Sequence, residues 1–192
     1  MRYEPGARPA HGLLTPVDRE APERVRRLRA LGLGAGPDLV FDAFADRLVE
    51  VTGSPYGIVN FVGERRQFFA GLRTPRGRSG VPLGAVPAVD GGPERCLARD
   101  RGYCPHVVVR RKALVLEDVR DYPRFAGNPL VDETGVRSYL GAPLIDRTGI
   151  ALGTVCVLDT EPRPWGRPGL ETIKTMAAEL VEEIHRREDG LL

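Results

Sequence analysis

Residues 139–159 read YLGAPLIDRTGIALGTVCVLD, two apolar runs on either side of a short polar connection. We predict strands over residues 136–145 and 150–158, joined as a hairpin around Thr148-Gly149. The small residues of Gly141-Ala142-Pro143 allow another backbone to approach the first strand closely. This stretch therefore predicts an antiparallel pair of strands.

The flanking sequence predicts further strands before this hairpin and helices toward both ends of the chain. Strands are expected over residues 56–62, 65–72, 106–109 and 113–119, and helices over residues 22–31, 39–52, 93–100 and 168–187. Asp38 is suited to cap the second helix and Gly53 to end it. Helices gather at the chain ends instead of alternating with strands, which argues against a doubly wound sheet. The predicted fold is α+β, with a central antiparallel sheet of about six strands flanked by helices.

A chain of 192 residues is long enough for one domain with a full core. We assign residues 1–21 to a flexible N-terminal arm, residues 22–188 to a single domain and residues 189–192 to a tail. Residues 74–92 are rich in proline, glycine and arginine and are expected to form a long surface loop. Loops of this length are usually functional or disordered.

The composition excludes several classes of protein. A net charge of +2 gives no bulk attraction to nucleic acid or to an anionic membrane. The basic run at residues 24–29 is expected to be the polar face of an amphipathic helix, and the run at 73–78 lacks the aromatic residues of a strand-binding groove. No apolar run approaches the ~20 residues that span a bilayer. Neither nucleic acid nor membrane is expected as a partner.

The residue usage also indicates where the protein acts. Arginine supplies almost all of the basic charge, which is typical of a GC-rich bacterial genome. The first fifteen residues carry charges and prolines where a signal peptide needs an apolar stretch. Three cysteines do not form a secreted disulfide framework. The cytoplasm is the expected location.

Several short motifs, in order, carry a resemblance to a known family. They are Arg-Arg-Gln-Phe-Phe at residues 65–69, Tyr-Cys-Pro-His-Val-Val at 103–108, Leu-Glu-Asp at 116–118, Pro-Arg-Phe-Ala-Gly-Asn-Pro-Leu-Val at 123–131, Tyr-Leu-Gly-Ala-Pro-Leu at 139–144, Gly-Ile-Ala-Leu-Gly-Thr-Val-Cys-Val-Leu-Asp at 149–159 and Pro-Arg at 162–163. Together they resemble the bacterial signalling branch of the GAF domain family over residues 22–187.

The resemblance implies a GAF/PAS-like fold, with the terminal helices packed on one face of the sheet. Loops and short helices would cover a pocket on the other face. Members of the family bind cyclic nucleotides, tetrapyrroles, haem or small metabolites. The proline- and glycine-rich segment at residues 74–92 departs from the family pattern where pocket-covering elements would lie, so no cofactor or ligand is assigned.

The candidate site follows from these motifs and the predicted strands. The residues expected to line the pocket are Phe69, Cys104, His106, Asp118 and Tyr139. Cys104 and His106 would share one face of a strand, and we favour a role in the pocket wall over catalysis. Cys156 is expected to be a small buried hydrophobe. The cysteine spacings match no metal-binding motif, so no metal site is expected.

Two functions remain open. The first, which we favour, is a sensory GAF module and not an enzyme; it binds a small molecule and signals through a partner protein. The alternative is a thiol-dependent redox enzyme or redox sensor on the same scaffold, similar to the branch of the family that reduces free methionine sulfoxide, with Cys104 and His106 as its catalytic candidates. A homodimer is expected to form through the terminal helices. Its seam would comprise Leu170, Ile173, Ala177, Leu180 and Ile184.

Overall fold

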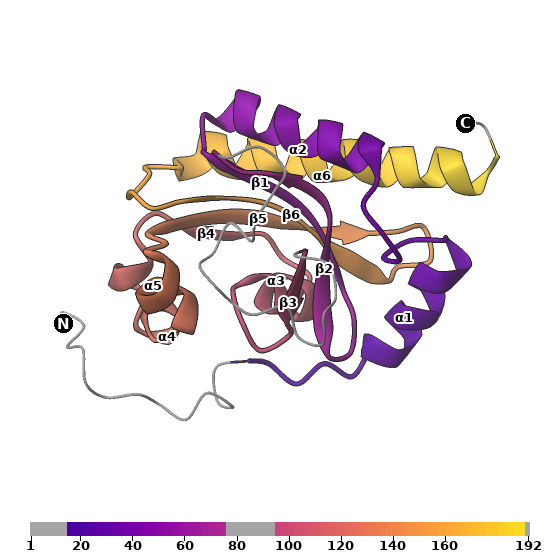
Figure 1. Ribbon diagram of the computed structural model, residues 1–192, viewed down its shortest axis with the longest axis horizontal. Helices are drawn as coiled ribbons and strands as arrows, with labels where there is room; N and C mark the ends of the chain where they lie inside the picture. The colour runs from indigo at the N-terminus through magenta and orange to yellow at the C-terminus, as the bar shows by residue number, and fades with distance from the viewer. Residues whose placement is uncertain (1–14, 76–94, 191–192) are drawn as a thin grey trace.

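A six-stranded antiparallel sheet forms the middle layer of the computed structural model, which describes residues 15–75 and 95–190 (Figure 1). Its order is β3-β2-β1-β6-β5-β4. The strands are β1 (Tyr56–Val62), β2 (Arg66–Arg73), β3 (Cys96–Ala98), β4 (Leu114–Leu116), β5 (Ser138–Ile145) and β6 (Ala151–Asp159). Every neighbouring pair is antiparallel. The predicted fold class and the predicted hairpin, now β5 and β6, are confirmed.

Helices cover both faces of this sheet. They are α1 (Ala21–Ala30), α2 (Leu39–Thr52), α3 (Cys104–Arg110), α4 (Pro123–Ala126), α5 (Pro129–Thr134) and α6 (Gly166–Glu188), together with a short 3-10 helix at Val119–Asp121. Figure 1 shows α2 and α6 side by side on one face, and α3, α4 and α5 on the other. No helix within the described ranges is long and apolar enough to cross a membrane.

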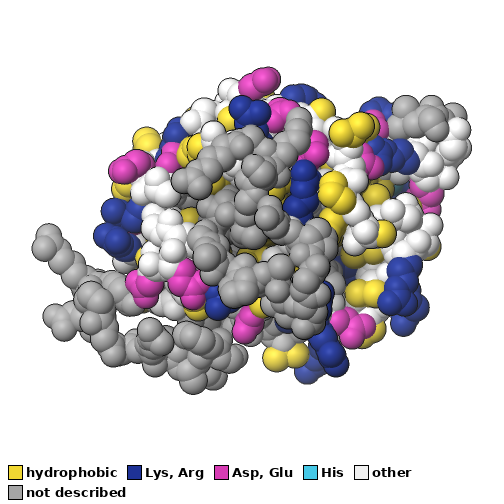
Figure 2. Space-filling view, in the orientation of Figure 1, with side chains coloured by type: hydrophobic (Ala, Val, Ile, Leu, Met, Phe, Trp, Pro, Cys, Tyr) yellow, Lys and Arg dark blue, Asp and Glu magenta, His cyan; other side chains and the backbone are white. Residues whose placement is uncertain are grey.

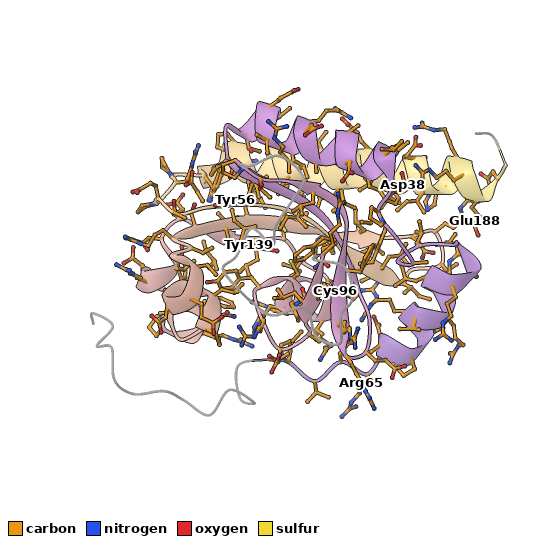
Figure 3. All side chains as sticks on the ribbon, in the orientation of Figure 1. Asp38, Tyr56, Arg65, Cys96, Tyr139 and Glu188 are labelled. Carbon is orange, nitrogen blue, oxygen red and sulfur yellow. The ribbon has the colours of Figure 1, made fainter. Side chains whose placement is uncertain are left out.

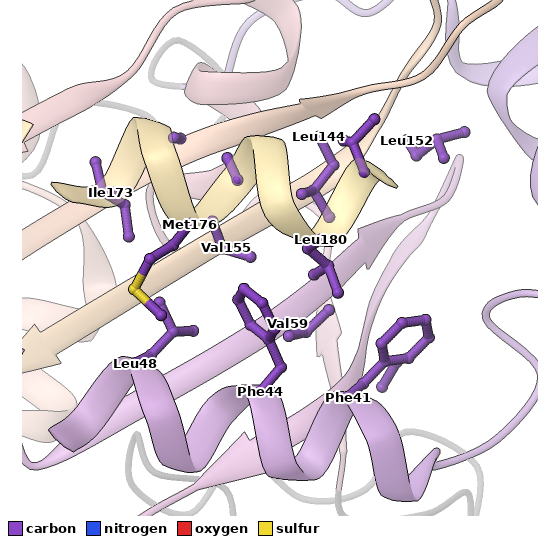
Figure 4. Close-up of a cluster of buried hydrophobic side chains, with 14 of the residues drawn as sticks. Phe41, Phe44, Leu48, Val59, Leu144, Leu152, Val155, Ile173, Met176 and Leu180 are labelled. Atoms are coloured by element: carbon purple, nitrogen blue, oxygen red, sulfur yellow. The ribbon is translucent and has the colours of Figure 1, made fainter. Parts of the chain in front are cut away.

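The first face is sealed by an apolar layer between α2, α6 and the sheet (Figure 4). Its largest members include Phe41, Phe44, Leu48, Val59, Val155, Ile173, Met176 and Leu180. Full burial of each such side chain stabilises the fold by roughly 1.5–3 kcal/mol. As predicted, the Asp38 carboxylate caps α2 by accepting from Val40 N at 2.8 Å, and Gly53 ends that helix in the left-handed region.

The apolar stripe of α6 is used inside the chain. Ile173, Leu180 and Ile184 are each no more than 1 % exposed and belong to the core under the sheet. A helix of this length obtains most of its stability from such packing. The expectation that this stripe forms a dimer seam is therefore wrong, since the stripe faces the chain's own strands. Within the chain α2 lies beside α6, and α1 meets the end of α6 through the ion pair of Arg27 with Glu188.

Two short elements differ from the sequence prediction. Residues 93–100 were expected to be helical, yet Cys96–Ala98 is β3, paired with residues 66–68 of β2. Residues 106–109 were expected to form a strand, yet they belong to α3. Pro105 lies in the first turn of α3 and nearly all of that helix is buried, so its sequence lacks the periodicity that separates helix from strand.

The predicted loop and arm are described only in part. Residues 76–94, which include most of the expected loop at 74–92, lie outside the described residues, as do residues 1–14 of the arm. Residues 15–20 contact the domain: the Thr15 hydroxyl donates to the Asp100 carbonyl, and Asp18 pairs with Arg24 and Arg99. The last part of the expected arm therefore belongs to the packed structure.

Arg24 of α1 is fully buried, although the basic run at residues 24–29 was expected to face solvent. Its guanidinium donates to the two carboxylate oxygens of Asp18 over 2.6 and 3.0 Å and to the Ala151 carbonyl over 2.5 Å. A buried charge is tolerated only when it is paired and hydrogen-bonded. The expectation of a solvated face is wrong at this position, and Arg24 joins α1 to β6.

We predict that Arg24→Ala lowers the free energy of unfolding by about 3 kcal/mol, because Asp18 and the Ala151 carbonyl lose their buried partner. Arg26→Ala is the matched control, since Arg26 is exposed on the same helix. It should change stability by no more than about 0.5 kcal/mol. Urea unfolding followed by circular dichroism measures both. Equal effects would show that the buried pair contributes nothing.

Candidate functional site

On the face opposite α2 and α6, α3 closes a small cavity against β5 and β6. Pro105 begins this helix, and Arg111 ends it in the left-handed region at φ 54°. The cavity measures about 20 Å³, which is room for about one water molecule. Its lining comprises Ile58, Gln67, Phe69, Leu97, Gly102, Tyr103, Cys104, Leu130, Tyr139, Cys156 and Leu158.

Two cysteines meet at this cavity. The sulfur of Cys104, on α3, lies 3.7 Å from the sulfur of Cys156, on β6. It also lies 3.4 Å from the hydroxyl of Tyr139, which is labelled in Figure 3 and projects from β5. All three side chains are buried, with Cys104 the most exposed at 7 %. The site thus holds a contacting pair of thiols with a phenol beside it.

The contact between the two sulfurs shifts the pKa values of the two thiols in opposite directions. Hydrogen bonding from Cys156 lowers the pKa of Cys104 below that of an ordinary thiol, against the opposing effect of burial, and the Tyr139 hydroxyl adds to this lowering. Hydrogen bonding to Cys104, burial and the neighbouring charge raise the pKa of Cys156. Because the thiolate is the nucleophilic form of a cysteine, this direction favours Cys104 as the more nucleophilic of the two.

A buried amide pair supports one wall of the site. Asn60 on β1 donates through Nδ2 to Oε1 of Gln67 on β2 at 3.0 Å. Gln67 donates through Nε2 to the carbonyls of Ala98 at 3.0 Å and Arg101 at 2.7 Å. These bonds hold β3 and the turn after it against β2. They explain why a glutamine occupies a position that is 1 % exposed.

Other polar atoms at the site have no partner within residues 15–75 and 95–190. They are the hydroxyl of Tyr103, which lines the cavity, the carbonyl oxygen of the Asn60 side chain, and the hydroxyl of Thr154, which lies opposite Asn60 across β1 and β6. Each unsatisfied buried group destabilises the fold by about 1–3 kcal/mol. A small polar molecule in the cavity would relieve part of this penalty.

The structure brings together three of the five predicted lining residues: Phe69, Cys104 and Tyr139. His106 does not line the cavity. It is two residues from Cys104 on a helix, not a strand, so it points elsewhere, and its ring packs against Phe125 with centroids 5.1 Å apart. The proposed Cys104 and His106 pairing on one strand face is therefore wrong.

Asp118 also lies away from the cavity. Its carboxylate accepts from Arg120 N at 3.1 Å, which caps the 3-10 helix, and pairs with the guanidinium of Arg137. The Arg137 side chain accordingly holds the pKa of Asp118 below its usual range. Asp118 caps a turn, and the prediction that it lines the pocket is wrong.

Sequence reasoning missed Gln67, Tyr103 and Cys156 as site residues. Gln67 and Tyr103 stand inside motifs already singled out, and the period of two along β6 places Thr154 and Cys156 on one face. What the sequence could not show is that α3 brings Cys104 to that face. Among the described residues, no group of three His, Cys, Asp or Glu side chains could hold a metal ion.

An antiparallel sheet with two long helices on one face and a helix-covered cavity on the other defines a small α+β domain. The GAF domain family model matches residues 36–184. The chain therefore belongs to the GAF domain family, and this membership implies a sensory or regulatory module.

Known proteins agree with this assignment. A curated cyclic di-GMP phosphodiesterase of Pseudomonas aeruginosa is 26 % identical over 155 residues, which are 80 % of this chain and 24 % of that protein. The chain thus spans about a quarter of the length of this curated relative.

Among solved structures, the GAF domain of an Acinetobacter phosphoenolpyruvate-protein phosphotransferase matches with a TM-score of 0.57 and 15 % identity, over 92 % of this chain and 100 % of that one. Free methionine-R-sulfoxide reductase from Neisseria meningitidis, solved with its substrate, matches with a TM-score of 0.57 and 15 % identity, over 93 % and 97 %. At these identities the likeness shows the fold.

His106 makes stability depend on pH. Burial first, and then the charges of Arg124, Arg110 and Arg99, lower its pKa from 6.5 to about 4. Between these values the unfolded chain binds a proton that the folded chain does not, so stability falls as pH falls from about 6.5 to 4. The loss is at most about 1.4 kcal/mol per pH unit.

We predict that His106→Leu removes this part of the acid sensitivity. Urea unfolding at several pH values between 4 and 7 measures it. His185→Leu retains His106 and should still show the loss. An unchanged pH dependence in His106→Leu would contradict the assignment.

Proposed function

We propose that this GAF domain senses a small polar molecule that enters the cavity beneath α3, and that it signals through a partner protein. The observation that carries the proposal is the buried hydroxyl of Tyr103, which lines the cavity and has no partner among the described residues. In a purely structural core such atoms would be replaced or paired. Phe69, Cys104 and Tyr139, with Gln67 and Tyr103, are the residues proposed to contact the ligand.

The cavity size limits the ligand. At about 20 Å³ it accepts a molecule close to water in size unless α3 or β3 moves. Cyclic di-GMP and methionine sulfoxide, named for the relatives above, are far larger. A ligand of small size fits the site as it stands, and a larger one requires its cover to open.

Signalling requires that the ligand binds two arrangements of the domain with different affinity. The cover of the site consists of α3 and the turn between β3 and α3. The turn attaches to β2 through Gln67, and α3 packs on β6. The sheet in turn supports α2 and α6. Movement of the cover would reach a partner through this helix layer.

Thiol-dependent redox chemistry is the second candidate function. It is favoured by one observation, the 3.7 Å contact between the sulfurs of Cys104 and Cys156. An enzyme that reduces methionine sulfoxide would need a wider site than the described residues leave, so an oxidant sensor fits the geometry better than that enzyme. All three cysteines are free, which fits a reducing compartment and the proposed cytoplasmic location in a bacterium.

We predict that Tyr103→Phe raises the free energy of unfolding of the ligand-free protein by about 1 kcal/mol, because it removes a buried hydroxyl that has no partner among the described residues. The same change should weaken retention of a co-purifying small molecule about tenfold, the equivalent of one hydrogen bond. Urea unfolding and native mass spectrometry measure the two effects.

Tyr122→Phe is the matched control, since Tyr122 is 37 % exposed and should tolerate the change. Destabilisation of Tyr103→Phe by more than about 1 kcal/mol would mean that the hydroxyl has a partner in the folded protein. That result would contradict the proposal that the Tyr103 hydroxyl is available to bind a ligand.

We propose in addition a homodimer through the exposed surface of α2 and α6. A groove of about 420 Å³ runs between these helices, lined by Val40, Ala43, Phe44, Arg47, Glu179, Glu182, Glu183 and Arg186. Val40 and Val51 are 45 % and 58 % exposed on one side of α2. Figure 2 shows acidic and basic side chains interspersed along this edge of the molecule. Both signs of charge on one surface suit pairing about a two-fold axis.

The dimer should have a mass of about twice 21.0 kDa at micromolar concentration, by light scattering. Val40→Glu together with Val51→Glu should reduce it to a monomer without loss of fold, because both side chains are already exposed. Val17→Glu, at a side chain 82 % exposed and outside these helices, should leave the dimer intact. A monomeric wild type would refute the proposed assembly.

A further inference from the structure

The cysteine pair has a property that ligand sensing alone does not require. The two sulfurs, at 3.7 Å, lie about 1.7 Å beyond the disulfide bond length of about 2.05 Å. They come from elements far apart in the sequence, α3 and the central strand β6. Both sulfurs line the cavity, together with the Tyr103 side chain whose buried hydroxyl lacks a partner among the described residues.

We propose that Cys104 and Cys156 are an oxidation site, in which a hydroperoxide of about the size of hydrogen peroxide converts the pair into a disulfide. The proposal rests on the sensory function above and gives its signal a chemical class. The cavity of about 20 Å³ admits an oxidant of this size and excludes a bulky one.

The reaction proceeds in two steps. The Cys104 thiolate attacks one oxygen of hydrogen peroxide, the O–O bond breaks, and the leaving hydroxide takes a proton, which gives a sulfenic acid and one water. The Cys156 sulfur then attacks the Cys104 sulfur, the S–O bond breaks, and the hydroxyl leaves with the Cys156 proton as a second water. Two thiols are oxidised by two electrons, and the peroxide is reduced to two waters.

The geometry assigns the roles within the pair. Cys104 is the attacking thiol because its sulfur contacts two possible hydrogen-bond donors, the Cys156 thiol at 3.7 Å and the Tyr139 hydroxyl at 3.4 Å. Cys156 is the resolving thiol because its sulfur lies 3.7 Å from that of Cys104 on the central strand β6. β6 is hydrogen-bonded on both sides, to β1 and β5, so the movement of about 1.7 Å falls mainly on α3.

Cys96 provides a control within the same molecule. It lies on β3 at the edge of the sheet, half-buried, and the cavity lining does not include it (Figure 3). Burial raises the pKa of Cys96. Cys96 is more accessible than Cys104, yet the proposal makes it the less reactive of the two. Exposure alone would predict the opposite order.

The test is a thiol count on the full chain. The reduced protein is treated with one equivalent of hydrogen peroxide, quenched with catalase, denatured and alkylated with iodoacetamide. Of the three thiols, only Cys96 should react, and a peptide map should join Cys104 to Cys156 with two hydrogens fewer. Dithiothreitol should restore all three. Three alkylated thiols after excess peroxide, or a bond through Cys96, would overturn the proposal.

Variants separate the two steps. Cys156→Ala should leave a Cys104 sulfenic acid that dimedone traps, whereas Cys104→Ala should protect Cys156 from oxidation. Cys96→Ser should form the disulfide as the wild type does. Cys104 should be oxidised about tenfold faster than Cys96 in the wild type, a comparison that needs no variant to fold. A ratio of one or less would contradict the roles assigned.

Hydrogen exchange distinguishes this inference from the sensory function. A disulfide accompanied by changed exchange in α3, α2 or α6 supports both. A disulfide with unchanged exchange in all three supports the oxidation site and overturns signalling through the helix layer. Absence of the disulfide in a protein that still retains a ligand through Tyr103 overturns the oxidation site alone.

Discussion

Complete burial of β6 is the constraint on which the rest of the fold depends. Every residue of Ala151–Asp159 is buried, so both faces of this strand must be covered. Val155 and Val157 pack under α2 and α6, while Cys156 packs under α3. Gly153 is required at the crossing with β1, where a Cβ would come within 1.9 Å of the Asn60 carbonyl. Because neither face of β6 can be left exposed, the fold needs a helical layer on each side of this strand.

The same constraint links the cavity to the helix pair. Successive residues of β6 point to opposite faces of the sheet. Cys156 therefore faces the cavity, while its neighbours Val155 and Val157 face α2 and α6. Close-packed layers cannot absorb a shift on one side without a response on the other. A displacement of α3 therefore has a short physical route to α2 and α6, the helices proposed above to bind a second copy or a partner protein.

The sequence predicted the elements whose signals are local. The hairpin of β5 and β6, the Asp38 cap and the Gly53 stop depend on neighbouring residues only, and the structure confirms them. Three features decided by tertiary contacts were not predictable in this way: the strand at Cys96–Ala98, which exists through pairing with β2, the helix at Cys104–Arg110, and the burial of Arg24, which depends on Asp18. Each is specified by a partner distant in sequence or in a segment expected to be flexible.

The strand predicted at residues 106–109, which is part of α3, also explains why only some of the predicted site residues line the cavity. A helix beginning at Cys104 places that residue against Tyr139 and Cys156, but turns His106 toward Phe125. A strand would have kept both on one side, next to Phe69. Because Cys104 lies on a helix, the side chain beside it is the thiol of Cys156 and not the imidazole of His106. A thiol–imidazole pair suits nucleophilic catalysis with turnover, whereas two thiols in contact suit a two-state oxidation, and the latter is the chemistry of a switch.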